Sequence, residues 1–218
     1  MPESCCRAEY DTIFNDRTAR RELDDYRRKG AAGSTARLVD AVKELGVDGA
    51  EVLDIGGGVG VVGTELLLAG AARLTDVDAS QPYLAAARLE VDRRGFGERA
   101  TFRYGDFVEV ASEIAPADIV TLDHVICCYG DWEALVDRSV ERTRRTYGVV
   151  FPVERWWIRA VARVGNAALR LFRKRFQFHV HPERQVDARI RAAGFERRIH
   201  HRGVIWQTAV YARTRPAA

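Results

Sequence analysis

The sequence lacks any hydrophobic run that approaches the roughly 18 apolar residues of a membrane span. Its N-terminus, residues 1–7, is polar and lacks the apolar stretch of a secretory signal peptide. Internal repeats, low-complexity tracts and linkers are also missing. A content of 47% hydrophobic and 30% charged residues is typical of a soluble globular protein. We therefore expect a cytoplasmic protein with a single domain over residues 1–218.

Cysteine is scarce, and its four copies form two adjacent pairs, Cys5–Cys6 and Cys127–Cys128. Neither pair has the Cys-x-x-Cys spacing of a metal or redox site, and a cytosolic chain keeps such thiols reduced. We expect no metal site and no structural disulfide. Cys127 and Cys128 are then small buried hydrophobic residues at a strand end, although adjacent thiols can also bind soft metals or metalloids.

Apolar strands alternate with helical segments through most of the chain. Strands are expected at 50–55, 73–80, 100–107, 117–126 and 146–152, with helices at 61–71, 81–95 and 132–145 between them. Two helices come first, at 7–29 and from Ser34 or Thr35, either of which could cap the helix, to about Leu45. "FERRIHHR" and "VIWQTAVYAR" flank Gly203 and predict a closing hairpin. The pattern predicts an α/β fold with a seven-stranded, mostly parallel, doubly wound sheet.

The domain is expected to have four parts. Residues 1–46 form an N-terminal helical cap, and residues 50–151 form a ligand-binding core. Residues 152–182 form a helical insertion, and residues 183–213 form the last helix and the closing strands.

The stretch "EVLDIGGGVGVVG", residues 51–63, forms a glycine-rich turn between a strand and a helix. Gly58, Gly60 and Gly63 spell G-x-G-x-x-G, which is typical of dinucleotide-binding turns. Asp54, however, is expected at the mouth of the turn, where a carboxylate would repel a pyrophosphate. It suits a ligand that carries positive charge and no phosphate, such as S-adenosylmethionine. An NAD(P)-dependent oxidoreductase remains the alternative.

Several motifs in order resemble those of class I S-adenosylmethionine-dependent methyltransferases. "VLDIGGGVG" resembles the first motif of that family, and "ADIVTLDHV" resembles the fourth. Asp78 in "TDVDAS" matches the acid that holds the ribose hydroxyls, and Asp106 in "YGDF" matches the acid near the adenine amine. The resemblance implies the cofactor S-adenosylmethionine, the product S-adenosylhomocysteine, and these cofactor-binding residues: Asp54, Gly56, Gly58, Gly60, Asp78, Ala79, Asp106, Phe107 and Asp123. Independently of it, one carboxylate can accept both hydroxyls of a ribose.

The segment "DHVICCY" lacks the Pro-Pro-Tyr or Pro-Pro-Phe of enzymes that methylate nucleic-acid bases. A groove of aromatic and lysine residues that could track a nucleic-acid strand is also missing from the sequence. We therefore expect a small-molecule acceptor, methylated at the oxygen of a hydroxyl or a carboxylate. His124 follows the fourth strand and could take the proton of a hydroxyl. It could equally orient the cofactor or fill the wall of the binding site. A carboxylate acceptor would need no base, because it is already ionised, and positioning alone would then carry the catalysis.

Between Arg155 and Arg175 the insertion carries seven basic residues and no acid. These are Arg155, Arg159, Arg163, Arg170, Arg173, Lys174 and Arg175. Trp157, Val161, Val164, Ala168 and Leu171 take another face of the same predicted amphipathic helix. Three interpretations stay open: a lid over an apolar, anionic acceptor, contact with an anionic membrane surface, or a solvated arginine face on a helix whose Trp side packs in the core.

Four residues are expected at the acceptor site: Tyr10, Tyr129, Trp157 and Arg159. "FNDRTA", residues 14–19, shows a faint likeness to magnesium-protoporphyrin O-methyltransferases, which does not assign the acceptor. Two further alternatives are a thiol or metalloid methyltransferase that uses the paired cysteines, and a non-catalytic binding protein. The protein is expected to be a monomer or a homodimer.

Overall fold

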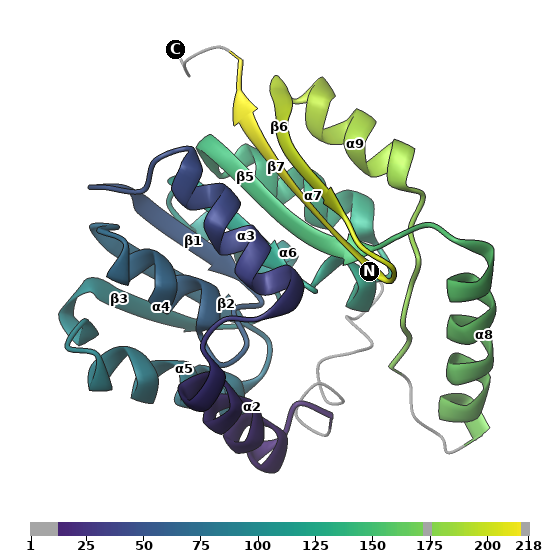
Figure 1. Ribbon diagram of the computed structural model, residues 1–218, viewed down its shortest axis with the longest axis horizontal. Coiled ribbons are helices and arrows are strands. Elements are labelled where there is room, and N and C mark those ends of the chain that lie inside the picture. The colour runs from purple at the N-terminus through teal and green to yellow at the C-terminus, as the bar shows by residue number, and fades with distance from the viewer. Residues whose placement is uncertain (1–12, 172–175, 215–218) are drawn as a thin grey trace.

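The computed structural model describes residues 13–171 and 176–214 (Figure 1). Cys5, Cys6, Tyr10 and the basic residues at 173–175 lie outside the described residues.

Seven strands form one sheet in the order β3-β2-β1-β4-β5-β7-β6. Their bounds are β1 Glu51–Ile55, β2 Arg73–Asp78, β3 Ala100–Tyr104, β4 Ala117–Asp123, β5 Thr143–Pro152, β6 Phe195–Arg202 and β7 Trp206–Arg213. The β1, β2, β3, β4 and β5 pairings are parallel, and β7 runs antiparallel to both β5 and β6. The predicted mostly parallel sheet with a C-terminal hairpin is confirmed.

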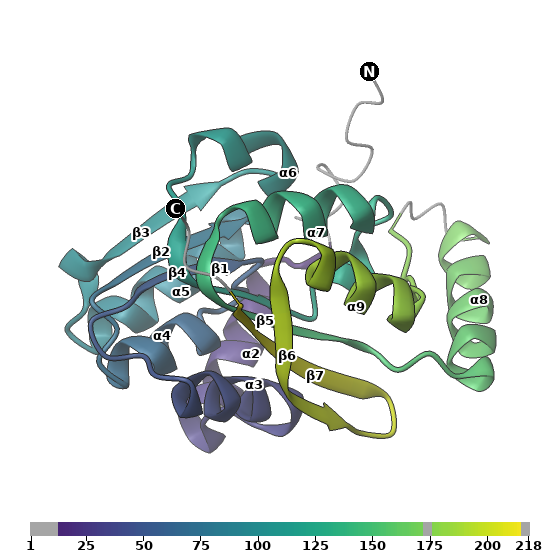
Figure 2. The same ribbon diagram turned by 90° about the horizontal axis from the view of Figure 1, so that it is seen from above.

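Helices cover both faces of the sheet (Figure 2). The helices α3 Gly33–Glu44, α4 Val61–Leu68 and α5 Gln81–Arg93 lie on one face, where Leu38, Leu66 and Val91 belong to one buried cluster. The helices α6 Phe107–Val110, α7 Trp132–Glu141 and α9 Glu183–Ala192 lie on the other, where Leu135 and Ile190 belong to a second cluster. Helix α2, Asp16–Lys29, packs on α5, and helix α8, Trp156–Leu171, stands at the edge of the molecule (Figures 1 and 2).

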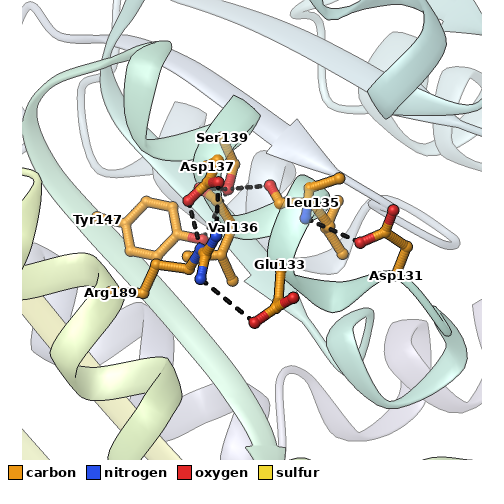
Figure 3. A network of polar contacts seen from close by, with 9 residues as sticks. Asp131, Glu133, Leu135, Val136, Asp137, Ser139, Tyr147 and Arg189 are labelled. Carbon is orange, nitrogen blue, oxygen red and sulfur yellow. Dashed lines mark hydrogen bonds and ion pairs between the residues drawn. The ribbon is translucent and has the colours of Figure 1, made fainter.

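Helix α9 is fixed to α7 by a set of ion pairs (Figure 3). The Arg189 guanidinium donates to the Asp137 carboxylate at 2.5 and 3.0 Å and to Glu133 at 3.3 Å. On the buried side of α7, the hydroxyls of Ser139 and Tyr147 lie 2.7 Å apart and link the helix to β5. Helix α7 therefore joins the last helix to the centre of the sheet.

The boundary between α7 and β5 differs from the prediction. The helix was expected to reach residue 145, but α7 ends at Glu141 and β5 begins at Thr143. Arg144 and Arg145 are exposed at the strand start, where they donate to the Glu51 carboxylate and the Gly46 carbonyl. In the sequence, the two arginines look like part of a solvent-exposed helix face. Contacts with residues far away in the sequence, Glu51 and Gly46, hold them in the strand instead.

The N-terminal helix brings its leading residues to the carboxyl edge of the sheet. Asn15 caps α2, since its side chain accepts a hydrogen bond from the Thr18 N–H at 3.1 Å. Tyr83 of α5 donates to Glu22 at 2.8 Å, and the Ser80 hydroxyl donates to the Phe14 carbonyl at 2.8 Å. These contacts place Phe14 over the ends of β1 and β2.

Candidate active site

The glycine-rich turn joins β1 to α4 in a backbone shape that favours glycine. Gly56, Gly58 and Gly60 have φ angles of 64°, 60° and 79°, in the left-handed region. Gly57 is required for another reason, because a Cβ there would lie 2.6 Å from Oδ1 of Asp76. The turn therefore passes closely over a buried acid.

Asp54 lies beneath the turn instead of at its mouth, which corrects the expected position. Its side chain is 1% exposed and accepts hydrogen bonds from the Gly63 N–H at 3.1 Å and the Thr121 hydroxyl at 2.7 Å. The carboxylate thus holds the start of α4 to β4. Burial raises the pKa of Asp54 above its ordinary value.

Asp76 is paired with Asp54 in the parallel register of β1 and β2 and is equally buried. Neither of its carboxylate oxygens has a hydrogen-bonding partner among the described residues. Burial, with the nearby Asp54 and Asp78, raises the pKa of Asp76 well above its ordinary value. Burial thus favours the neutral, protonated form of Asp76, because an isolated buried carboxylate is costly.

Asp78 ends β2 at the edge of the sheet, beside the glycine turn. Its carboxylate accepts hydrogen bonds from the Gly58 N–H at 3.0 Å and the Ser80 N–H at 2.7 Å. Asp78 and Ala79 both line the cavity described below. The acid therefore ties the turn to the start of α5 while facing the cavity.

Asp106 caps α6, where it accepts a hydrogen bond from the Val108 N–H at 2.9 Å. The Tyr129 hydroxyl lies 3.0 Å from each of its carboxylate oxygens. Burial, with Asp106 beside it, raises the pKa of Tyr129 above its ordinary range, so the phenol stays a donor. Tyr129, expected at the acceptor site, is thus linked to the acid expected near adenine. Phe107 is 5% exposed and lines the same cavity.

His124 follows β4 in a strained conformation. It is the one non-glycine residue with a positive φ angle, 62°, in the described part of the chain. Such strain persists only where the surrounding structure imposes it, and it often marks functional sites. Its ring packs edge-on against Trp206, with centroids 4.2 Å apart.

Both ring nitrogens of His124 face polar groups. Nδ1 lies 2.8 Å from Oδ1 of Asp123, and Nε2 lies 3.0 Å from the Ser34 hydroxyl. The contact with Asp123 is electrostatic, because its Oδ1 has no hydrogen-bonding partner among the described residues, and the Ser34 hydroxyl can donate to Nε2 or accept from it. The Thr35 hydroxyl donates to the other oxygen of Asp123 at 2.7 Å and helps to hold it in place.

Ser34 and Thr35 therefore do not act as the helix caps suggested by the sequence. Helix α3 begins at Gly33, its N-cap position is Ala32, and no side chain caps it. The two hydroxyls lie in the first helical turn and contact Asp123 and His124 instead. From the sequence, a hydroxyl residue at a helix start can cap the helix or contact another segment. Here the end of β4 lies close enough for the two hydroxyls to contact its residues.

These residues surround a cavity of about 610 Å³ at the carboxyl edge of the sheet, a size typical of cofactor and ligand sites. Of the predicted site residues, its wall includes Gly56, Gly58, Asp78, Ala79, Asp106, Phe107, Asp123, His124 and Tyr129. Asp54 and Gly60 are not on the wall, and a Cβ on Gly60 would lie 2.9 Å from Ala87, so that glycine serves helix packing.

Several apolar residues of the wall were missed by the sequence analysis: Ile13, Phe14, Tyr83, Phe176, Phe178 and Trp206. Trp157 and Arg159, expected at the acceptor site, lie on α8 and do not line the cavity. The insertion reaches the cavity through Phe176 and Phe178 on its return segment instead. Their alternation in "FQF", pointing two aromatic rings to one side, is the signal that could have found them.

The two described cysteines also lie on the cavity wall. The sulfur atoms of Cys127 and Cys128 are 3.8 Å apart, and both lie near the His124 carbonyl. The neighbouring thiol and burial raise the pKa of Cys127 well above its ordinary value, so it is a neutral thiol. Over residues 13–171 and 176–214, no cluster of three or more His, Cys, Asp or Glu side chains is suited to a metal ion.

Comparison with known families agrees with this geometry. Residues 52–146 match the family model of a methyltransferase domain. A comparison with curated protein sequences gives no match. The match covers the glycine turn, Asp78, Asp106 and His124. The matched segment is thus a methyltransferase domain, a class of enzyme that takes its methyl group from S-adenosylmethionine.

Solved structures share the fold. A magnesium protoporphyrin IX methyltransferase from Synechocystis PCC 6803 with bound S-adenosylhomocysteine matches 94% of this chain and 100% of its own, with 20% identity and a TM-score of 0.68. An O-methyltransferase family protein from Burkholderia thailandensis matches 94% of this chain and 62% of its own, with 18% identity and a TM-score of 0.71. A family 2 O-methyltransferase from Planctomyces limnophilus in complex with apigenin matches 92% of this chain and 62% of its own, with 16% identity and a TM-score of 0.64.

The residues of this chain fit that cofactor. The nearest atom to a Cβ added to Gly58, outside the adjoining residues, would be a ring carbon of Tyr83 at 3.7 Å. A ligand in the cavity can therefore come close to the backbone at Gly58. Carboxylates at Asp78 and Asp106 suit the hydroxyl and amine donors of a nucleoside. The Asp78 carboxylate beside the turn also suits a cationic sulfonium better than a pyrophosphate.

Proposed function

We propose that this enzyme methylates the oxygen of a small, largely apolar molecule and that His124 takes the proton of the acceptor. The observation that carries the proposal is the position of His124. It lies on the cavity wall with Asp123 at one ring nitrogen and a hydroxyl, that of Ser34, at the other. We take Nε2, the nitrogen that faces this hydroxyl, to receive the proton of the acceptor.

When bound, S-adenosylmethionine would supply a methyl group on a positively charged sulfur, and the carbon–sulfur bond would break to leave neutral S-adenosylhomocysteine. The acceptor oxygen forms its new bond to carbon as it loses its hydrogen. Nε2 of His124 receives that proton, either directly or through the Ser34 hydroxyl, which passes on its own. Asp123 then lies 2.8 Å from a charged imidazolium and stabilises it.

The apolar wall favours a lipophilic acceptor. Phe14, Phe176, Phe178 and Trp206 supply aromatic surface to the cavity wall. Two of the similar structures are named for magnesium protoporphyrin IX and for a complex with apigenin, which are both flat and largely apolar molecules. Their names support a lipophilic phenol or acid as the acceptor of this chain.

A screen of lipophilic phenols and carboxylic acids, with mass detection of the methylated product, tests the proposal. His124→Asn then separates the acceptor types, because Asn tolerates a positive φ and is not a base at neutral pH. With a phenol we expect kcat to fall by about 10²–10⁴-fold. With a carboxylate, which is already ionised, kcat should stay nearly constant. An unchanged kcat with a phenol would remove His124 from proton transfer.

A thiol or metalloid acceptor is a second candidate, favoured by the two cysteines on the cavity wall. Their sulfur atoms, 3.8 Å apart, could hold a soft ligand beside the transferred methyl group. Methylation of trivalent arsenic by the wild type, lost in a Cys127→Ala, Cys128→Ala variant, would favour this candidate over the first.

A further inference from the structure

Helix α8 presents an unusually apolar surface to solvent. Trp156, Val161, Val164 and Leu171 are 82%, 65%, 71% and 80% exposed. Ile158 is the buried residue of this 16-residue helix. Nothing in the described part of the chain covers the exposed side. Scattered apolar residues are normal on a protein surface, but a row of them along one helix marks an interaction site.

The geometry of the helix separates two sides. Successive residues turn by about 100° in an α-helix. Ile158 and Asn166 point towards the protein, where the Asn166 side chain bonds both the N–H and the carbonyl of Phe178, at 2.9 and 2.8 Å. Trp156, Val164 and Leu171 fall on the opposite side of the helix. The apolar side therefore faces away from the fold and is not a part of its core.

Charge on this segment is of one sign. The sequence holds seven basic residues and no acid from 155 to 182. Arg163 and Arg170 are exposed along one edge of the apolar side, and neither makes an ion pair with a described residue. Arg159 differs, because it pairs with Glu154 at the base of the helix. The exposed face is thus apolar in its centre and cationic at its edge.

We propose that α8 docks on the surface of an anionic lipid bilayer. Its apolar side chains enter the boundary between headgroups and acyl chains, and Arg163 and Arg170 reach the lipid phosphates. An amphipathic helix with Trp and Leu on one face and arginine on the other is the arrangement that binds in this plane. A partner protein with an apolar groove would account for the apolar side of α8, but it would give no role to the uniformly positive charge of the segment. No helix within the described ranges is long and apolar enough to cross the bilayer, so α8 lies on the surface.

A second apolar element lies at the same end of the molecule. Val204 and Ile205, at the tip of the β6–β7 hairpin, are 66% and 45% exposed. The Val153 N–H, three residues before α8, donates to the Ile205 carbonyl at 2.7 Å. Figures 1 and 2 both show this tip beside the segment that leads into α8. Docking would bring the cavity wall at Phe176, Phe178 and Trp206 near the bilayer, where lipophilic acceptors dissolve.

Flotation of the full chain with lipid vesicles tests the proposal, without cofactor or acceptor, so that it is independent of the methylation chemistry. We expect binding to phosphatidylcholine vesicles that contain phosphatidylglycerol and little binding to phosphatidylcholine alone. Arg163→Glu should weaken binding at least about fivefold, the contribution of one cation near an anionic surface. Val164→Glu should weaken it more, since it places a charge in the apolar face. Both side chains are exposed, so both variants should keep the wild-type melting temperature.

Two matched controls use exposed positions on other helices. Leu89→Glu on α5, at a leucine that is 62% exposed, makes an equivalent apolar-to-acid change. Arg20→Glu on α2 makes the same charge reversal at an exposed arginine. Both should bind vesicles as the wild type does. Wild-type protein that fails to bind anionic vesicles, or equal binding by Val164→Glu, would overturn the proposal. So would a dimer in solution that Val164→Glu dissociates, because a second copy would then cover this face.

Discussion

Replacement of Asp78 by alanine should raise the dissociation constant of the cofactor. The Asp78 carboxylate lines the cavity and is the acid expected to hold the ribose hydroxyls. A hydrogen bond to a charged group contributes about 1–3 kcal/mol. The dissociation constant should therefore rise by about 5- to 150-fold, since 1.4 kcal/mol is a factor of ten. S-adenosylmethionine and S-adenosylhomocysteine share the ribose, so calorimetry should give similar factors for both.

The same variant also removes two hydrogen bonds within the protein, from the Gly58 and Ser80 N–H groups. Its unfolding free energy without ligand has to be measured beside the affinity. Asp78→Asn keeps one acceptor oxygen without the charge and should give a smaller loss. Asp40→Ala, at an exposed acid on α3, is the control and should change neither quantity. A folded Asp78→Ala protein with unchanged affinity for both ligands would refute this assignment.

Two further predictions follow from the same wall, and a third follows from the buried acid Asp76 beneath the turn. Gly58→Val should abolish S-adenosylmethionine binding in calorimetry, because it places a side chain on the cavity side of the turn and strains a φ of 60°. Cys127→Ala, Cys128→Ala should keep cofactor affinity and lose about 1 kcal/mol of unfolding free energy through packing alone, unless the cysteines bind the ligand. Asp76→Asn should flatten the fall in stability with rising pH. The folded pKa of Asp76 lies above its unfolded value, so the folded state keeps a proton that the unfolded state loses, and the contribution of Asp76 to wild-type stability declines as pH rises above about 4. Equal pH slopes of unfolding free energy in wild type and variant would contradict that reasoning.

The sheet and the acids at its edge could be predicted because their signals are local. Asp78 ends β2, Asp106 lies two residues after β3 and His124 directly follows β4, and parallel strands bring their carboxyl ends to one edge. The structure places all three on one cavity wall. Their contacts with cofactor and acceptor remain predictions.

The rest depended on contacts between distant segments. Asp54 belongs to the same glycine motif, but its burial follows from Thr121 on the neighbouring strand β4, which the motif does not include. Ser34 lies 90 residues from His124 in sequence, and its spacing predicted only a helix cap. Phe176 and Trp206 reach the cavity from the return of the insertion and from the closing hairpin. No pattern of residues within either segment predicts that these two side chains lie on the same cavity wall.

The central claim is methylation of an acceptor at oxygen, and the atom that receives the methyl group tests it most directly. S-adenosylmethionine with a ¹³C-labelled methyl group can be incubated with the enzyme and each acceptor of the phenol and acid panel. The carbon chemical shift of the product then identifies the atom to which the label is bound. We expect the shift of a methyl ether or methyl ester, and no product from Gly58→Val. A label bound to nitrogen, sulfur or carbon would contradict the account.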